Sequence, residues 1–243
     1  MVHYRPISAI AVFIFIIIAF IAIHLFYFPQ FYTSIDEREY IRNAFLLQQG
    51  TLTEPDITKA CTGRFNGEGY ISQYFIGRSV FLIPFTWGGL PFIMLSGLVI
   101  HLLNAFLFYK LLRRLHFHPV YTLLYFLFPA FFWASRTLGS ELLALTGIFA
   151  GVYLYLGTRK QQTLSGLLFG LTLFIRYEIA LIAMAFLMIS ILKDRKKFLS
   201  LLIGFVPAVA FLLIFNQTVY GGLLTGGYAT PFSAFINMNP YDL

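Results

Sequence analysis

Two adjacent carboxylates stand in a short charged stretch that closely follows the first long apolar run of the chain. The run covers 7–28, and residues 34–40 read S-I-D-E-R-E-Y. A carboxylate at a membrane edge can act as a general base toward a hydroxyl group, so Asp36 and Glu37 are candidate catalytic residues. The same pattern also suits the start of a helix, with Ser34 as N-cap and the two acids in the first turn. The local pattern leaves both interpretations open.

Two further pairs of an arginine and an acid interrupt the apolar sequence. Arg136 and Glu141 bracket a short loop, and Arg176 and Glu178 lie within another apolar region. At a lipid–water boundary, a guanidinium can bind a phosphate through two parallel hydrogen bonds, so these four residues are candidate substrate-binding residues. Two structural alternatives stay open. Arg136 could snorkel to the interface, and the 176–178 pair could form an ion pair with Asp36 or Glu141.

The remaining polar residues give weaker signals. His101 and Asn104 share one helix face and His24 lies in the first run, where packing hydrogen bonds explain them better than ligand binding. The single cysteine, Cys61, excludes an internal disulfide and a cysteine-clustered metal site. No metal ligands are therefore predicted. A divalent cation such as Mg²⁺ or Mn²⁺ is permitted on Asp and Glu oxygens but is not implied.

The composition indicates a polytopic membrane protein. Of the 243 residues, 59% are hydrophobic and only 11% are charged, against about 25% charged residues in soluble domains. The net charge of +7 does not form a basic stripe on one soluble face, so no nucleic-acid partner is expected. Membrane lipids are the expected surroundings. The first apolar run is longer than the apolar core of a signal peptide and is expected to be a retained span.

The apolar runs predict an all-α membrane protein with about seven transmembrane helices. We place them at 7–28, 91–109, 119–134, 141–157, 164–175, 179–192 and 198–215. Basic clusters occur at every second connection, and the positive-inside rule puts these clusters in the cytoplasm. The N-terminus is then cytoplasmic, and all the candidate site residues lie on the extracytoplasmic face of the cell membrane.

The fifth and sixth runs are each shorter than the ~20 residues of a full span. A single long helix would bury Arg176 and Glu178 near the bilayer centre, at about 2.5–3.5 kcal/mol each. It would also place one basic cluster outside. We therefore predict a helical hairpin with 176–178 at its outer tip.

The chain is expected to form a single module, 1–243, with a long first outer segment at 29–90. Residues 35–49 have helical apolar spacing and predict an amphipathic helix on the membrane surface. Residues 51–69 are expected to form a loop and 70–86 a second interfacial helix. The outer segment 216–243 is rich in Gly and ends in apolar residues, which suggests a truncated or minimal module.

Several motifs together resemble the GT-C superfamily of integral-membrane glycosyltransferases. They look closest to the branch that includes dolichyl-phosphate-mannose protein mannosyltransferases and lipid A aminoarabinose transferases. The motifs are S-I-D-E-R-E-Y-I-R-N-A, N-G-E-G-Y-I-S-Q-Y-F-I-G-R-S-V-F-L-I-P-F, S-R-T-L-G-S-E-L, G-L-L-F-G-L-T-L-F-I-R-Y-E-I-A-L and F-N-Q-T-V-Y-G-G-L-L-T-G-G-Y. Ile76 departs from the pattern, because the family usually has proline before its glycine.

The resemblance implies an inverting transfer of a hexose or pentose from a polyprenyl-phosphate donor to a lipid, glycan or protein acceptor. Asp36 would then be the general base, and Glu37 would orient it or help to hold a cation. Arg136 and Arg176 would neutralise the phosphate leaving group. The sugar site would be lined by tyrosines: Tyr40, Tyr70 and Tyr74.

Two other classes of function remain open at this stage. A transporter or flippase of a lipid-linked sugar would also need intramembrane charges and interrupted helices. The absence of an internal repeat and the clustering of the charges on one face speak against it. A noncatalytic membrane assembly subunit is the third possibility, and a sugar-transfer assay separates it from the first.

Overall fold

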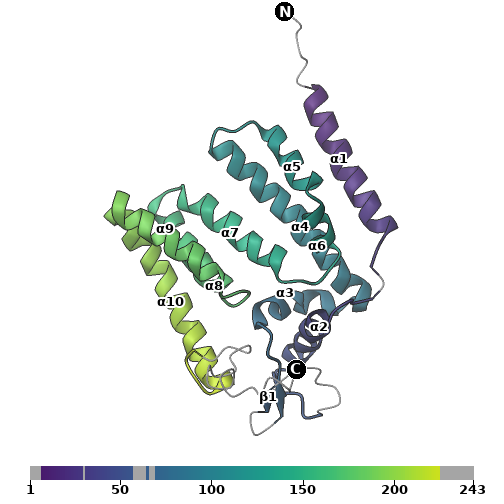
Figure 1. Ribbon diagram of the computed structural model, residues 1–243, viewed down its shortest axis with the longest axis vertical. Coiled ribbons are helices and arrows are strands. Elements are labelled where there is room, and N and C mark those ends of the chain that lie inside the picture. The colour runs from purple at the N-terminus through teal and green to yellow at the C-terminus, as the bar shows by residue number, and fades with distance from the viewer. Residues whose placement is uncertain (1–6, 30, 57–63, 66–68, 225–243) are drawn as a thin grey trace, which may run out of the picture.

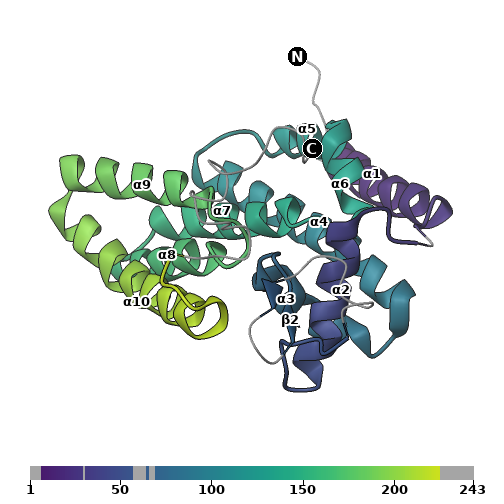
Figure 2. The same cartoon turned by 60° about the horizontal axis from the view of Figure 1, so that its bottom comes forward.

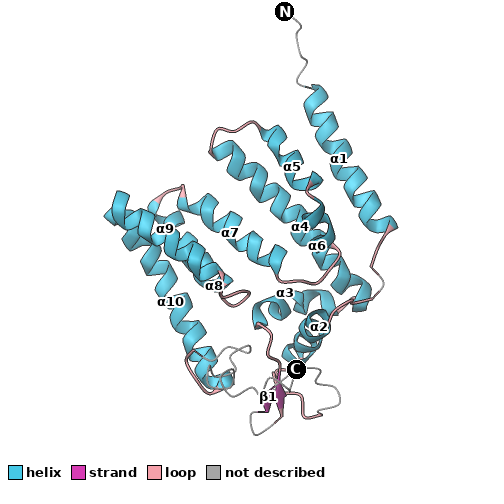
Figure 3. Cartoon of the chain, viewed as in Figure 1, coloured by secondary structure: helices cyan, strands magenta, loops and turns pink. Residues whose placement is uncertain are grey.

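The structure is a computed structural model that describes residues 7–29, 31–56, 64–65 and 69–224. Within these residues the chain forms ten α-helices, one short 3-10 helix and a hairpin of two-residue strands (Figure 3). The predicted all-α class is confirmed for this part of the chain.

The secondary-structure elements follow one another through short connections. The helices are α1 Ile7–Phe26, α2 Ile35–Gln48, α3 Ile76–Thr86, α4 Gly89–Arg114, α5 Thr122–Leu127, α6 Pro129–Ser135, α7 Glu141–Tyr155, α8 Arg159–Thr172, α9 Ile179–Lys193 and α10 Arg195–Tyr220. The 3-10 helix Pro119–Tyr121 precedes α5. Strands β1 Arg64–Phe65 and β2 Tyr70–Ile71 pair antiparallel between α2 and α3.

The long helices form a row, with α10 at one side and α1 at the other (Figure 1). The short helices α2 and α3 and the hairpin gather at one end of this row, and the view in Figure 2 shows them beneath it. Helix α8 packs against α7 and α10, α4 against α7, and α2 against α3. Helices α8 and α10 approach closely, since a Cβ on Gly166 would lie 2.0 Å from the Leu201 carbonyl oxygen. Such close contact at small residues is typical of helix pairs in membranes.

Two of the described helices have the length and hydropathy of a membrane span. Helices α4 and α10 each contain 26 residues, and their most apolar windows have mean hydropathies of 2.0 and 2.7. Only 28% of the α10 window is buried inside the protein. The apolar helices α7 and α9 are shorter, at 15 residues each. By length and composition, α4 and α10 could cross a membrane.

The third predicted span is not one continuous helix, so the prediction for 119–134 is wrong in this respect. The chain instead forms the 3-10 helix, α5 and α6, with a break at Phe128 (φ −77°, ψ 111°). Pro129 causes this break, because a proline pushes the preceding residue into extended backbone and lacks the N–H that would continue the helix.

The predicted interfacial helix 70–86 begins six residues late. Tyr70 and Ile71 form strand β2, and the backbone of Tyr70 also exchanges hydrogen bonds with Glu54 (2.8 and 3.0 Å). The helix starts at Ile76 and ends at Thr86. The predicted loop 51–69 correspondingly contains β1. Helical apolar spacing carries no information about a hydrogen-bonded partner strand, so a short paired strand was read as the start of the helix.

Two other boundaries agree with the sequence. Helix α2 occupies nearly the whole of the predicted surface helix 35–49. The chain also turns back at Leu173–Glu178, between α8 and α9, where the helical hairpin was predicted. For the predicted outer C-terminal segment, 225–243 lie outside the described residues.

Candidate functional site

The first turn of α2 contains the two carboxylates singled out from the sequence. Ser34 accepts a hydrogen bond from the Glu37 N–H (3.2 Å), and the Glu37 carboxylate accepts one from the Ser34 N–H (3.3 Å). This is a capping box, in which two backbone donors at the helix start are satisfied reciprocally. The helix-start interpretation is therefore confirmed, and it leaves the chemistry of Asp36 open.

Asp36 and Glu37 point in different directions, because successive residues on an α-helix diverge by about 100°. Glu37 is only 3% exposed, and its second oxygen, Oε1, accepts a hydrogen bond from the Leu138 N–H (2.9 Å). Asp36 is exposed and lines a cavity. The helix thus presents one carboxylate to solvent and uses the other to bind the backbone of a distant loop.

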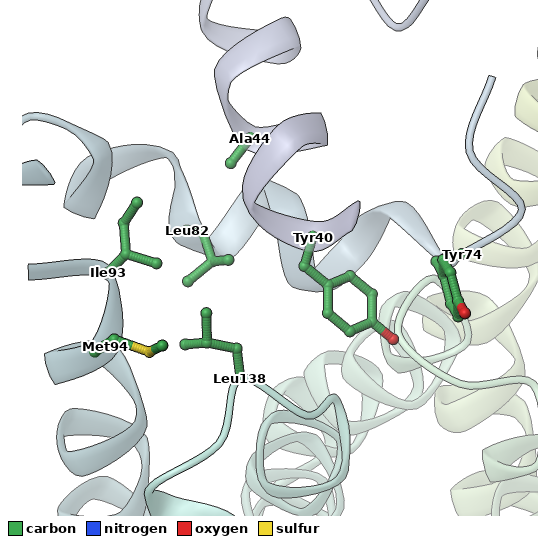
Figure 4. Packing of buried hydrophobic residues seen from close by; sticks show 7 residues of the cluster. All are labelled: Tyr40, Ala44, Tyr74, Leu82, Ile93, Met94 and Leu138. Carbon is green, nitrogen blue, oxygen red and sulfur yellow. The ribbon is translucent and has the colours of Figure 1, made fainter. Parts of the chain in front are cut away.

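A buried apolar cluster fixes α2 against α3 and α4. Its members are Tyr40, Ala44, Tyr74, Leu82, Ile93, Met94 and Leu138. In Figure 4 the Tyr40 ring projects toward Tyr74, and the aliphatic side chains gather on the other side of α2. The two rings meet edge to face with 5.8 Å between centroids, a favourable arrangement for an aromatic pair. The apolar packing therefore sets where the tyrosine hydroxyls point.

The site is a cavity of about 440 Å³ at the junction of α2, the loop before α7 and the turn between α8 and α9. Its lining residues are Asp36, Tyr40, Phe75, Gly139, Ser140, Glu141, Arg176, Tyr177 and Glu178. The volume is within the range of small-molecule sites. Segments separated by more than one hundred residues in sequence meet here. Five residues predicted from the sequence, Asp36, Tyr40, Glu141, Arg176 and Glu178, come together in it.

Arg176 is at the centre of the charged groups in the cavity. Its guanidinium forms ion pairs with Glu141 (2.5 Å) and Glu178 (3.1 Å), and the three side chains are 32%, 62% and 64% exposed. Hydrogen bonding to Glu178 raises the pKa of Arg176, and the reciprocal bond lowers the pKa of Glu178. The proposed pairing of Arg176 with Glu141 is therefore found, and both groups also face the cavity.

The tyrosines beside the carboxylates are protonated at neutral pH. Burial is the main cause that raises the pKa of Tyr40, whose hydroxyl is hydrogen-bonded with Ser140. Burial and a hydrogen bond with Asp36 raise the pKa of Tyr74 to about 12. Tyr74 thus lies beside Asp36 at the edge of the cavity and holds the carboxylate side chain in place.

An apolar groove of about 390 Å³ adjoins the cavity. It runs between α6, α7 and the start of α9 and is lined by Ala130, Phe131, Ala134, Glu141, Leu142, Ala144, Leu145, Ile148, Arg176 and Ile179. Glu141 and Arg176 line both the groove and the cavity. The two spaces therefore meet at a charged boundary, with polar surface on one side and hydrocarbon on the other.

Three predicted site residues do not line the cavity. Arg136 donates a hydrogen bond to the Tyr27 carbonyl oxygen and lies over aromatic rings at 5.9 Å, which matches the interfacial alternative. Tyr70 is in strand β2 and pairs with Glu54. Glu37 is bound to backbone amides. The expected gathering of all outer charges around Asp36 is thus narrower than predicted.

Four cavity residues were missed from the sequence: Phe75, Gly139, Ser140 and Tyr177. Phe75 packs edge-on against Tyr177 with 4.3 Å between centroids. Their proximity to the predicted charged residues in sequence was the available signal, because each is adjacent or nearly adjacent to one of the charged or tyrosine residues. Among the described residues, no group of three or more His, Cys, Asp or Glu could hold a metal ion.

We compared the chain with models of known protein families, with curated proteins and with solved structures, and none of them matches it. The site therefore has to be interpreted from its own geometry and chemistry.

Proposed function

We propose that the chain is a membrane glycosyltransferase, or a module of one, that moves a sugar from a polyprenyl-phosphate donor to a hydroxyl acceptor on the extracytoplasmic face. The observation that carries the proposal is the shared boundary between the polar cavity and the apolar groove, at Glu141 and Arg176. A lipid-linked sugar has the same three-part chemistry: a hydroxyl-rich head, a phosphate and a hydrocarbon chain. The motif resemblance described above points to the same class.

In this proposal the donor sugar occupies the cavity, its phosphate lies at Arg176 and its hydrocarbon chain enters the groove. Tyr40 and Phe75 offer aromatic surface to the sugar ring. Asp36 removes the proton from the acceptor hydroxyl as its oxygen attacks the anomeric carbon, and the phosphate leaves toward Arg176. A base on one side and a cation on the other suit an inverting displacement. Arg136, outside the cavity, has no part in this scheme.

The exposed surface supports a membrane setting. Large apolar side chains of α9 and α10 face outward, among them Leu181 (72% exposed), Leu192 (82%) and Ile203 (65%). Contiguous exposed apolar surface of this kind marks contact with lipid or with another protein. We place α4 and α10 across the bilayer, with the remaining long apolar helices beside them. Seven crossings and a cytoplasmic N-terminus remain the proposed topology.

The test is sugar transfer by the purified protein or by membranes that contain it. The probes are polyprenyl phosphates that carry a labelled hexose or pentose. We expect transfer by the wild type and a loss of about 10²–10⁴-fold in Asp36→Asn, as is typical when a general base is removed. Arg38→Gln, an exposed change on the same helix turn, is the matched control. Full transfer by Asp36→Asn would reject the mechanism, and movement of the intact donor across vesicles without transfer would favour a transporter.

A further inference from the structure

Arg78 is the largest fully buried side chain of the protein, and its place next to the site is unusual. It belongs to α3, is 0% exposed and does not line the cavity. A guanidinium is rarely buried completely unless it is paired. Its nearest carboxylates are not in hydrogen-bond contact, and instead the group binds neutral partners on two other segments.

The contacts of Arg78 converge on the loop that leads into α7. Its Nε donates to the Leu138 carbonyl oxygen (3.1 Å), and its Nη2 donates to the Ser96 hydroxyl (3.2 Å) on α4. Its Nη1 has no hydrogen-bond partner. Burial lowers the pKa of Arg78 to about 10, and nearby Tyr40 and acids oppose this. The side chain therefore keeps its charge at neutral pH.

Leu138 is held from both ends of its backbone. Its carbonyl oxygen accepts from Arg78, and its N–H donates to Glu37 Oε1. A cation and a carboxylate thus grip one buried residue, and the next three residues in the chain, Gly139, Ser140 and Glu141, line the cavity. Hydrogen bonds to charged groups are stronger than those between neutral groups.

The residue before Arg78 holds the second loop of the site. The Gly77 N–H donates to the Phe174 carbonyl oxygen (2.9 Å), two residues before Arg176. A side chain could not replace this glycine without moving that turn, because a Cβ would lie 2.7 Å from the same oxygen. Two successive residues of α3 therefore bind the two segments that provide Glu141 and Arg176.

We propose that Arg78 is a positioning residue for the site: together with Glu37 it fixes Leu138, and thereby sets the position of Ser140 and Glu141 against Arg176. Its role in transfer rests on the proposed function. Its effect on the loop does not, so the two can be tested separately.

The first experiment measures the loop directly by thiol labelling. In a Cys61→Ser background, a reporter cysteine replaces Ser140, which is 5% exposed, and a control cysteine replaces Ser190, which is 0% exposed on distant α9. Replacing Arg78 with Met should increase the labelling rate at position 140 about tenfold or more, since the lost bonds involve a buried charged group. Labelling at position 190 should not change.

Two further variants separate positioning from general support of the fold. Arg78→Lys keeps the charge but cannot supply the same forked donors, and it should give an intermediate labelling rate at position 140. Ser96→Ala removes one partner of Arg78 and leaves the bond to Leu138, so it should leave that rate near wild type. Equal labelling of positions 140 and 190 in both Arg78 variants, or slow labelling at 140 in both, would overturn the proposal.

The second experiment relates the loop to the site. With the polyprenyl-phosphate sugar probes, Arg78→Lys should raise the donor KM more than it lowers kcat, because the residue acts through Glu141 and touches no reacting atom. A changed labelling rate together with no transfer by the wild type would reject the proposed function and keep the role of Arg78 in the loop. Unchanged KM in a variant with an opened loop would overturn its role in the site.

Discussion

The two loops that meet at the cavity are built in opposite ways. The loop before α7 is fixed by buried groups, namely Arg78, Glu37 and the fully buried Leu138. The turn between α8 and α9 carries its charges at the surface, where Arg176 pairs with two acids that are both more than 60% exposed. The comparison suggests a rigid wall and a more adaptable one on opposite sides of the same cavity.

The adaptable turn still has anchors of its own. Tyr177 is hydrogen-bonded with Asn216 on α10 (3.2 Å) and packs against Phe75. The Gly77 N–H binds the backbone of the turn. These anchors fix the backbone but leave the Arg176 guanidinium free to exchange a carboxylate for a phosphate. This division of roles suits a site that must admit and release an anionic group.

The largest expected effect on stability comes from adding a methyl group beneath the rigid loop. A Cβ on Gly97 would lie 2.3 Å from the Ser135 carbonyl oxygen, and backbone cannot move aside there as a flexible side chain would. Gly97→Ala should lower the free energy of unfolding by about 1–3 kcal/mol. Denaturant unfolding in detergent measures this. Gly50→Ala is no suitable control, because Gly50 has a φ of 78°, so Ser79→Gly on α3 is avoided as well and Val80→Ala, at an exposed position, serves instead.

The second prediction concerns the carboxylate that holds the rigid loop. Glu37→Ala leaves the buried Leu138 N–H without an acceptor and removes the capping box, which should cost about 2–3 kcal/mol in unfolding free energy. Glu37→Gln retains a carbonyl oxygen and should lose less. If the two variants were equally stable, the bond between Glu37 and Leu138 would not hold the loop.

The third prediction applies the methyl-group test to the adaptable turn. Gly77→Ala should displace Phe174 and destabilise the protein by about 1 kcal/mol, less than Gly97→Ala, because the turn can shift outward. Arg176 would move with it, so polyprenyl phosphate should bind more weakly. A destabilisation larger than that of Gly97→Ala would reverse the assignment of the rigid and adaptable walls.

The fourth prediction separates stability from activity at Arg176. Its ion pairs are exposed, and such pairs contribute about 0–1 kcal/mol, so Arg176→Gln should unfold at nearly the same denaturant concentration as the wild type. Sugar transfer should nevertheless fall by more than tenfold if Arg176 stabilises the leaving phosphate. Arg42→Gln, a change to the ion pair with Glu39 away from the cavity, provides a comparison in which stability falls.

The smallest effect is a pH dependence of stability. The hydrogen bond from Arg176 lowers the pKa of Glu178 below its ordinary 4.5. Its contribution is therefore present above pH 4.5 and is lost as the pH falls through the lower, folded-state pKa. The loss should be small because Glu178 is largely exposed, and Arg176→Gln should abolish it. Thermal unfolding between pH 6 and pH 3 provides the measurement.

The sequence by itself determined the helical class, the α2 cap and the charged residues of the adaptable turn. Each of these follows from local rules: apolar periodicity, the serine and glutamate spacing at a helix start, and the cost of burying Arg176 within a single long helix. It also indicated Asp36, because an exposed acid in a first helical turn is visible in the local pattern.

Only the tertiary structure decided which charges meet. Asp36 and Glu37 were equivalent in the sequence, yet the helix turns one into the cavity and the other into the backbone of the loop. Arg136 had the same sequence signature as Arg176, but it packs among aromatic rings, outside the cavity. Arg78 gave no signal, since its role depends on partners 18 and 60 residues away. Contacts at such separations are set by helix packing, and no local pattern records them.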